Sequence, residues 1–224
     1  MSTCLIVGAS RGIGRELVRQ YAADGQRVIA TYRKGSDGAA LGELGARTIE
    51  LDVLQEGFAA TLERQLGGEA LDLAIIVAGV AGPRSAQLSA PLRADFDRVM
   101  RTNVLASMQL IPVLAEPLAA GHGKLAVISS KMGSIGNTTD ASSWLYRASK
   151  AALNSVLKAA STELGGRGIV CMALHPGWVR TDMGGAGATL AVEESVASMR
   201  RVIAAATRSH NGRFLNYNGE QLEW

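Results

Sequence analysis

The chain has 224 residues, of which 47% are hydrophobic and 19% are charged, and its formal net charge is +3. A chain of this length can bury the core of one α/β domain, and its apolar content excludes a disordered segment. Its arginines are scattered rather than grouped in blocks, which argues against nucleic acid as a partner.

No run of the sequence approaches the roughly 20 apolar residues of a membrane helix, so we expect no membrane span. The first strand is expected to begin by residue 3, without the segments typical of a secretory leader. Cys4 and Cys171 lie inside apolar runs, where cysteine usually acts as a small buried hydrophobe, and no disulfide framework is implied. These features predict a cytoplasmic protein.

Short apolar runs alternate along the chain with amphipathic segments of helical length, which is typical of βαβ units. We expect strands at 3–7, 27–31, 47–51, 71–77, 124–129, 169–174 and 213–216, and helices at 13–24, 55–66, 92–118, 145–165 and 191–206. Most of the strand runs are apolar throughout, as in a parallel sheet covered on both faces. The predicted fold class is α/β, a doubly wound, seven-stranded parallel sheet flanked by helices (a Rossmann fold), with residues 1–224 as one domain.

A glycine-rich segment follows the first strand and leads into the first helix. Glycines at this turn let the backbone approach a pyrophosphate, whose charge the helix amino terminus stabilises. The spacing alone is also compatible with a tight βα turn that binds nothing. The candidate cofactor residues of this segment are Gly8, Ser10, Arg11, Gly12, Ile13 and Gly14.

The end of the second strand carries Tyr32, Arg33 and Lys34 and no acid. A carboxylate there would favour NAD, because it bonds the ribose 2′-hydroxyl and repels a 2′-phosphate. Arginines are suited to a phosphate, so Arg33 and Arg11 favour NADP(H), although a solvated turn would look the same. Asp52-Val53 after the third strand and Ala78-Gly79 after the fourth are further candidates for contact with this cofactor.

Tyr146 and Lys150 lie four residues apart on one helix, so their side chains share a face. Tyrosine ionises near pH 10, and a neighbouring ammonium together with the positive charge of oxidised nicotinamide is expected to lower that pKa. Ser130 ends the fifth strand, where it could bond a substrate oxygen, and Asn103 could hold water leading to Lys150. Simpler interpretations remain open, namely a serine that caps a turn and an asparagine bonded to its own helix.

Taken together and in this order, the motifs resemble those of the short-chain dehydrogenase/reductase family, over almost the whole chain. The features that carry the resemblance are Gly8/Gly12/Gly14, Asp52-Val53, Ala78-Gly79, Asn103, Ser130, Tyr146/Lys150 and the run Pro176-Gly177-Trp178-Val179-Arg180-Thr181. Residues 128–135, 146–154 and the tail from 214 to 224 are more specifically similar to the C-factor/sniffer-type carbonyl reductases of that family.

The resemblance implies an enzyme that moves hydride between NADP(H) and a small carbonyl or alcohol substrate, without a metal. Asn103, Ser130, Tyr146 and Lys150 would form its catalytic tetrad, and Lys150 would also bind the nicotinamide ribose. Pro176, Gly177, Val179 and Thr181 would hold the carboxamide. A homodimer or homotetramer is expected by the same resemblance.

Two positions depart from the family pattern. Val7 replaces a threonine before the glycine loop, and Ile76-Val77 replaces a pair of asparagines. In the family such polar side chains join neighbouring strands, so we expect Val7 and Val77 to be a matched apolar pair. Losing both polar partners costs less than burying one of them alone.

The substrate pocket is expected to be formed by residues 81–90, the loop 131–145 and the segment after Thr181. Its candidate lining residues are Ser130, Met132, Trp144, Trp178 and Met183. Residues 182–190 are too short and glycine-rich for a helical lid, which predicts a mobile, shallow flap and broad substrate tolerance. One alternative is a regulatory or signalling protein that senses the dinucleotide with little turnover. Another is an epimerase or dehydratase acting on nucleotide sugars, which would need more carboxy-terminal chain for a substrate domain.

Overall fold

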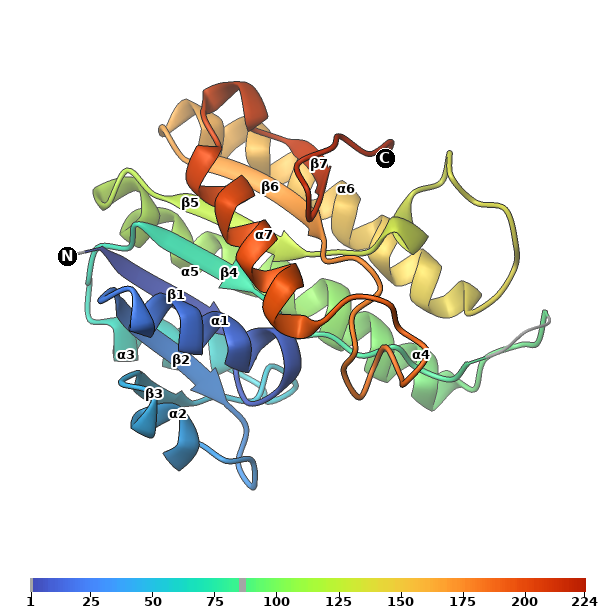
Figure 1. The fold of residues 1–224 in the computed structure, drawn as a ribbon, viewed down its shortest axis with the longest axis horizontal. Coiled ribbons are helices and arrows are strands. Elements are labelled where there is room, and N and C mark those ends of the chain that lie inside the picture. The colour runs from blue at the N-terminus through green and yellow to red at the C-terminus, as the bar shows by residue number, and fades with distance from the viewer. Residues whose placement is uncertain (1, 85–87) are drawn as a thin grey trace.

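In the computed structural model, which describes residues 2–84 and 88–224, parallel strands form one sheet between two layers of helices (Figure 1). The strands are β1 (Thr3–Val7), β2 (Arg27–Tyr32), β3 (Arg47–Glu50), β4 (Leu73–Ile76), β5 (Lys124–Ile128), β6 (Val170–His175) and β7 (Arg213–Asn216). Their order in this seven-stranded sheet is β3-β2-β1-β4-β5-β6-β7, and all neighbours are parallel. The fold class expected from the sequence is confirmed.

The helices agree with the expected segments except in two places. They are α1 (Gly12–Ala23), α2 (Ala39–Glu43), α3 (Phe58–Leu66), α4 (Arg93–Met100), α5 (Ala106–Ala120), α6 (Trp144–Gly166) and α7 (Val192–Ala205). The five-residue α2 was not expected, because its surroundings are rich in glycine and it buries only Ala40 and Leu41. The segment expected as one helix at 92–118 is divided between α4 and α5 by a π-helical turn, η1 (Arg101–Leu105). Two short 3₁₀ turns, η2 (Lys131–Gly133) and η3 (Arg208–His210), complete the helical elements.

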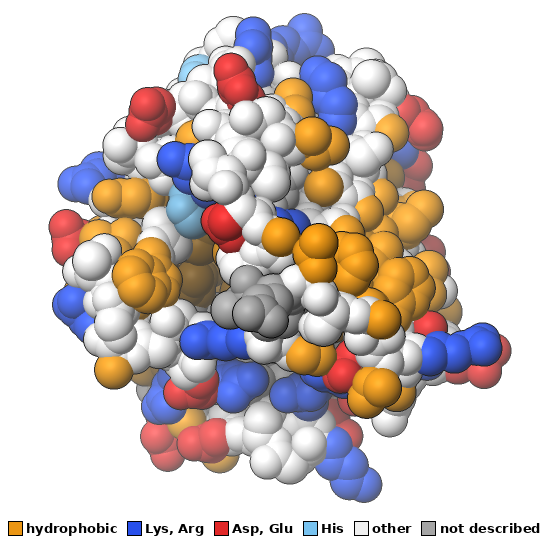
Figure 2. Space-filling view, turned by 90° about the vertical axis from the view of Figure 1, so that its right-hand side faces the viewer, with side chains coloured by type: hydrophobic (Ala, Val, Ile, Leu, Met, Phe, Trp, Pro, Cys, Tyr) orange, Lys and Arg blue, Asp and Glu red, His pale blue; other side chains and the backbone are white. Residues whose placement is uncertain are grey.

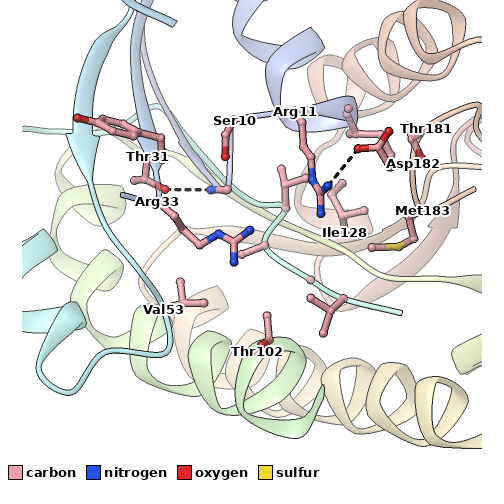
Figure 3. A pocket seen from close by; sticks show the side chains of 18 of the residues that line it. Ser10, Arg11, Thr31, Arg33, Val53, Thr102, Ile128, Thr181, Asp182 and Met183 are labelled. Carbon is pink, nitrogen blue, oxygen red and sulfur yellow. Dashed lines mark hydrogen bonds and ion pairs between the residues drawn. The ribbon is translucent and has the colours of Figure 1, made fainter. Parts of the chain in front are cut away.

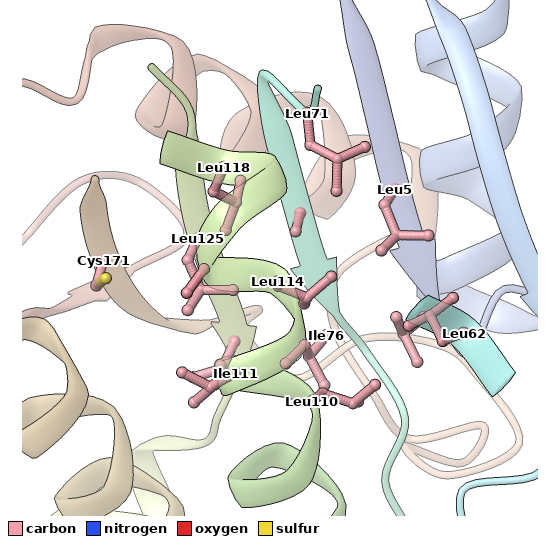
Figure 4. Close-up of a cluster of buried hydrophobic side chains, with 14 of the residues drawn as sticks. Leu5, Leu62, Leu71, Ile76, Leu110, Ile111, Leu114, Leu118, Leu125 and Cys171 are labelled. Atoms are coloured by element: carbon pink, nitrogen blue, oxygen red, sulfur yellow. The ribbon is translucent and has the colours of Figure 1, made fainter. Parts of the chain in front are cut away.

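Helices cover both faces of the sheet, which explains why most strands are apolar throughout. On one face, α3, α5 and α6 pack on strand residues such as Leu5, Ile76 and Leu125 (Figure 4). On the other face, α1, α2 and α7 pack on residues such as Ile6 and Ile75. Because side chains of a strand alternate between faces, the cluster to which a residue belongs tells on which side of the sheet it lies.

The helical stretch Arg93–Ala120 is long and apolar enough to cross a membrane by length and composition, contrary to the expectation from the sequence. Half of the qualifying window is buried inside the protein. Leu110, Leu114 and Leu118 of α5 belong to the cluster on the sheet. We therefore interpret the stretch as a core helix, whose apolar side chains pack on the sheet.

Candidate active site

A cavity of about 410 Å³ opens at the carboxyl edge of the sheet, and the face toward which the strands point is hollowed there (Figure 2). We call it the main cavity. Its walls come from the segments that follow the strands from β1 to β6, and from α4, η1 and α6. β1 lies between β2 and β4, so the strand order reverses at this point, and ligands of open α/β sheets bind where it does.

Most residues that the sequence singled out for a cofactor line this cavity. They are Gly8, Ser10, Arg11, Gly12, Ile13, Tyr32, Arg33, Asp52, Val53, Ala78, Gly79, Tyr146, Lys150, Pro176 and Thr181. Four others do not line it directly: Gly14, Asn103, Gly177 and Val179. Of the five substrate candidates, Met183 alone lines it, whereas Ser130, Met132, Trp144 and Trp178 lie outside its lining.

The glycine loop needs its glycines for close backbone packing. Gly8 has a φ of +90°, and a Cβ there would lie 2.7 Å from the backbone nitrogen of Ala78. A Cβ on Gly14 would lie 2.2 Å from the oxygen of Gly8. Arg11, the residue before α1, gives no side-chain cap to the helix. The first amides of α1 are therefore free of side-chain capping, which suits the end of a helix that binds an anion.

Two arginines extend toward the main cavity from its glycine-loop end, as Figure 3 shows for Arg11 and Arg33. Arg11 Nη1 lies 3.0 Å from Asp182 Oδ2, and both side chains are largely exposed. This ion pair joins the glycine loop to the segment after Thr181. The sequence interpretation treated Arg11 as free for a phosphate and did not foresee its acidic partner.

The adenine end of the expected site is formed by the segment after β3 and by helix residues. Asp52 Oδ1 accepts a hydrogen bond of 2.9 Å from the Leu54 amide, so this carboxylate shapes its own turn. Thr102 and Arg98 also line the cavity. Neither was singled out in the sequence, because a threonine or an arginine within a helix carries no motif of its own.

Tyr146 and Lys150 lie together at the other end of the main cavity. Lys150 Nζ is 5.8 Å from the centre of the Tyr146 ring and donates a hydrogen bond of 2.8 Å to the oxygen of Ile128. Burial lowers the pKa of Lys150 to about 8. Burial raises the pKa of Tyr146, and a hydrogen bond with the Ser130 side chain opposes that rise. In the ligand-free site Lys150 therefore does not lower the pKa of Tyr146, because desolvation outweighs the favourable contacts. The lowering expected with oxidised nicotinamide bound stays a prediction.

Ser130 has two roles in its turn. Its Oγ accepts a hydrogen bond of 3.2 Å from the Met132 amide, so the interpretation of Ser130 as a capping serine is correct. The same hydroxyl contacts Tyr146. Because Oγ accepts from the backbone, its hydrogen is available for the side of the cavity that holds the tyrosine.

Asn103 lies in the π-helical turn η1, a type of irregularity that often occurs at functional sites. Its Oδ1 accepts from the Val80 amide at 2.8 Å, and its Nδ2 donates to the oxygen of Val80 and to Ser149 Oγ, both at 2.9 Å. The simpler interpretation, a bond to its own helix, is therefore not what the structure has. A Cβ on Gly79 would lie 3.4 Å from Asn103 Oδ1 and 3.5 Å from Lys150 Nζ. Gly79 thus keeps the space between Asn103 and Lys150 open.

The segment 182–190 contains no helix, as expected from its glycines. It is tied to the chain before it, because Leu190 exchanges backbone hydrogen bonds with Trp178 and Arg180. The Trp178 indole also donates to the oxygen of Gly184 at 3.0 Å. These hydrogen bonds hold the segment more firmly than the expected mobile, shallow flap would be held. Its mobility stays a prediction. The pairing of Leu190 with its neighbours leaves the Val179 amide on the opposite side of this strand-like segment.

The expected substrate wall is only partly in view, since residues 85–87 of the stretch 81–90 lie outside the described residues. Trp144 is 42% exposed, and its indole donates to the oxygen of Ser89 at 3.0 Å. Trp178 and Met183 are also exposed. Large apolar side chains at this rim agree with a site that receives apolar molecules.

The expected Val7–Val77 pair is wrong. Val7 belongs to the cluster under α3, α5 and α6, whereas Val77 contacts the cluster under α1, α2 and α7. In the β1–β4 register, the partner of Val7 is Ile76. A shift of one residue moves a side chain to the other face of a sheet, so Ile76 is the neighbour that shares a face with Val7.

Sequence reasoning also missed Thr31, whose Oγ1 accepts a hydrogen bond of 2.9 Å from the Gly8 amide. Thr31 is a buried polar residue near the end of an apolar strand, and that position is a signal that could have found it. This hydrogen bond joins the glycine loop to β2.

Comparison with known proteins agrees with this architecture. A family model described as short chain dehydrogenase matches residues 2–189. C-signal of Myxococcus xanthus is 40% identical over 155 residues, which are 69% of this chain and 93% of that protein. A putative short-chain dehydrogenase/reductase from Burkholderia multivorans, solved with bound NADP, has a TM-score of 0.90 at 30% identity, covering 100% of this chain and 99% of that one. The carbonyl reductase Sniffer of D. melanogaster has a TM-score of 0.85 at 30% identity, with 100% of both chains covered. The chain belongs to the short-chain dehydrogenase family.

Proposed function

We propose that this chain is an NADP(H)-dependent oxidoreductase, one domain over residues 1–224, that transfers a hydride between the nicotinamide and an aldehyde, a ketone or the corresponding alcohol. The observation that carries the proposal is that Tyr146 and Lys150 lie together at one end of the main cavity, with the Ser130 side chain beside Tyr146 just outside the cavity lining. The opposite end has an uncapped helix and two arginines. One end of the cavity thus suits a dinucleotide phosphate, and the other end suits a reacting carbonyl.

The residues present fit such a cofactor. The amides at the start of α1 would hold the pyrophosphate, and Arg11 and Arg33 would hold the 2′-phosphate. Thr181, the Val179 amide and the turn at Pro176 and Gly177 would hold the carboxamide. When bound, the reduced nicotinamide supplies the hydride.

The protein's own part in the reduction is proton transfer to the carbonyl oxygen. Ser130 donates a hydrogen bond to that oxygen, and Tyr146 gives it a proton. The raised pKa of Tyr146 keeps the phenol protonated and ready for this step. The Lys150 ammonium then stabilises the phenolate, and its pKa of about 8 allows it to be charged near neutral pH.

The relatives support this function. The Burkholderia multivorans protein binds NADP, and Sniffer is a carbonyl reductase. We further propose a cytoplasmic location and a homodimer or homotetramer, without membrane or nucleic acid as a partner, as the sequence analysis expected.

A second candidate is a signalling protein that binds the dinucleotide with little turnover. The observation in its favour is the 40% identity with C-signal. It would not require Tyr146, Lys150 and Ser130 to lie in reacting positions, which is why we rank it second.

The deciding experiment measures NADPH oxidation with a panel of aliphatic and aromatic aldehydes and ketones, for the wild type and for Tyr146→Phe. The variant lacks only the hydroxyl, so we expect turnover to fall by about 10²–10⁴-fold while NADPH still binds. More than a tenth of wild-type turnover in the variant would contradict the role of Tyr146. NADPH binding without turnover of any carbonyl by the wild type would favour the signalling protein.

A further inference from the structure

The turn that carries Ser130 is joined to α6 by a side chain that the proposed reaction does not use. Asn154, two helical turns beyond Tyr146, is almost fully buried. Its Oδ1 accepts a hydrogen bond of 2.5 Å from Ser129 Oγ, and its Nδ2 donates one of 3.3 Å to the oxygen of Gly133. One amide group thus contacts the residues on both sides of the segment from Ser130 to Met132.

Strand alternation explains why Ser129 reaches this helix. Leu125 and Val127 of β5 belong to the cluster under α5 and α6, and Ser129 continues that row by one more step of two residues. A polar residue at this buried position needs a partner, and Asn154 supplies it. The contact therefore depends on the register between β5 and α6.

The turn also lies directly on α6 at the catalytic lysine. A Cβ on Gly133 would lie 2.7 Å from the carbonyl carbon and the Cβ of Lys150. The Gly133 amide donates to the oxygen of Ser130 at 2.8 Å. A displacement of Gly133 would therefore move the serine relative to the helix that bears Tyr146 and Lys150.

We infer that Asn154 is a positioning residue for the Ser130 hydroxyl, which it holds in register with Tyr146 through Ser129 and Gly133. This inference rests on the proposed function, in which Ser130 bonds the substrate oxygen. Asn154 is buried and does not line the main cavity, so it is placed to act through its neighbours rather than on a ligand. We expect its effect on the reaction to pass through the serine, which the double variants below test.

The test compares Asn154→Leu, Ser129→Ala and the matched control Asn211→Leu, by steady-state kinetics, NADPH binding and thermal unfolding. Like Asn154, Asn211 joins two segments through both ends of its amide, here the Cys171 amide and the oxygen of Ser161, each at 2.9 Å, but at the amino end of β6. Each variant is also made in a Ser130→Ala background. Ser129→Ala removes only one hydroxyl and so provides a second reading if Asn154→Leu folds poorly.

A misplaced catalytic group can lower the reaction rate by up to about 10²-fold. We therefore expect kcat to fall by roughly 10- to 100-fold in Asn154→Leu and by a smaller factor in Ser129→Ala. The NADPH dissociation constant should change by less than about threefold. In the Ser130→Ala background the loss should nearly vanish, because the two residues act as one unit. Asn211→Leu should lower the melting temperature and keep kcat.

Three results would overturn the inference. Asn154→Leu and Ser129→Ala could both keep wild-type kcat, or Asn154→Leu could lower kcat by the same factor with and without Ser130. Alternatively, Asn211→Leu could lower kcat as much as Asn154→Leu, which would mean that the loss of kcat reflects lower stability and not the position of Ser130. If Ser130→Ala itself kept full activity, the proposed function would be wrong about the serine, and this outcome is separate from the other three.

Discussion

The two ends of the main cavity are held by different interactions. At the glycine-loop end, the backbone packs closely through Gly8 and Gly14, and the charged groups, Arg11 and Asp182, are largely exposed. At the catalytic end, side chains that are almost fully buried bond to one another and to the backbone, as Asn103 and Asn154 do.

This difference predicts two kinds of response to substitution. Exposed charges are screened by solvent and salt, so each should change cofactor affinity by less than a buried group changes turnover, with coupling confined to charges in direct contact such as Arg11 and Asp182. Buried polar groups share partners, so removing one should have a large effect that depends on the others. The predictions below test this contrast from the largest effect to the smallest.

Lys150→Met should have the largest effect, because Lys150 is proposed to support both the phenolate and the ribose. We expect kcat to fall by about 100-fold or more and NADPH affinity to fall as well. Stopped-flow hydride transfer and fluorescence titration measure the two losses separately. An unchanged NADPH dissociation constant would contradict the second role.

The same variant tests the electrostatics of the buried ammonium. The pKa of Lys150 is lowered from 10.5 to about 8, so burying its ammonium costs stability, and the wild type bears this cost fully at pH values below 8. Between pH 8 and pH 10.5 the wild type should therefore gain stability relative to Lys150→Met, by an amount on the order of 3 kcal/mol. Urea unfolding of both proteins across this range checks the sign, and a constant difference would contradict it.

Arg33→Ala should weaken NADPH binding by about tenfold or more and leave NADH binding nearly unchanged, because a charge-assisted contact to phosphate contributes roughly 1.5–3 kcal/mol. Arg64→Ala is the control, since it removes the same charge from α3, where Arg64 contacts Thr61. Equal losses for NADPH and NADH, or a similar loss in Arg64→Ala, would argue against a phosphate site at Arg33.

Val7→Thr tests the corrected strand pairing. Val7 is fully buried, so the added hydroxyl lacks a partner and should reduce the free energy of unfolding by about 1–3 kcal/mol. Because Ile76 shares its face, adding Ile76→Asn should recover part of the loss, whereas Val77→Asn should not. Denaturant unfolding of the single and double variants measures both couplings. Recovery by Val77→Asn would restore the pairing that the structure contradicts.

The sequence was informative where function depends on local order along the chain. Apolar runs predicted the seven strands to within about two residues, and the spacing of Gly8, Gly12 and Gly14 predicted a loop that the structure places on the cavity. Tyr146 and Lys150 share a helix, so their proximity followed from helical periodicity.

What the sequence could not predict depends on contacts between distant segments. Asn154 meets Ser129 across 25 residues, and Arg11 meets Asp182 across 171, with no spacing rule for either pair. The Val7–Val77 error arose because neighbouring strands can be shifted by one residue without any change in the apolar pattern. Burial likewise decided the direction of the Tyr146 pKa, and burial is a property of the packed structure.

The smallest expected effect belongs to Asp182→Asn. Arg11 is bound to Asp182 in the ligand-free protein, and a phosphate that used Arg11 would first have to displace this carboxylate (Figure 3). Both side chains are largely exposed, so the ion pair contributes at most about 1 kcal/mol. The variant should bind NADPH about two- to threefold more tightly than the wild type, with a smaller gain for NADH. Salt should reduce the gain, because it screens exposed charges.

The charge-conserving Asp182→Glu should keep the wild-type affinity, and in an Arg11→Ala background the gain should disappear. Weaker NADPH binding by Asp182→Asn would mean instead that the ion pair closes over the bound cofactor and helps to retain it.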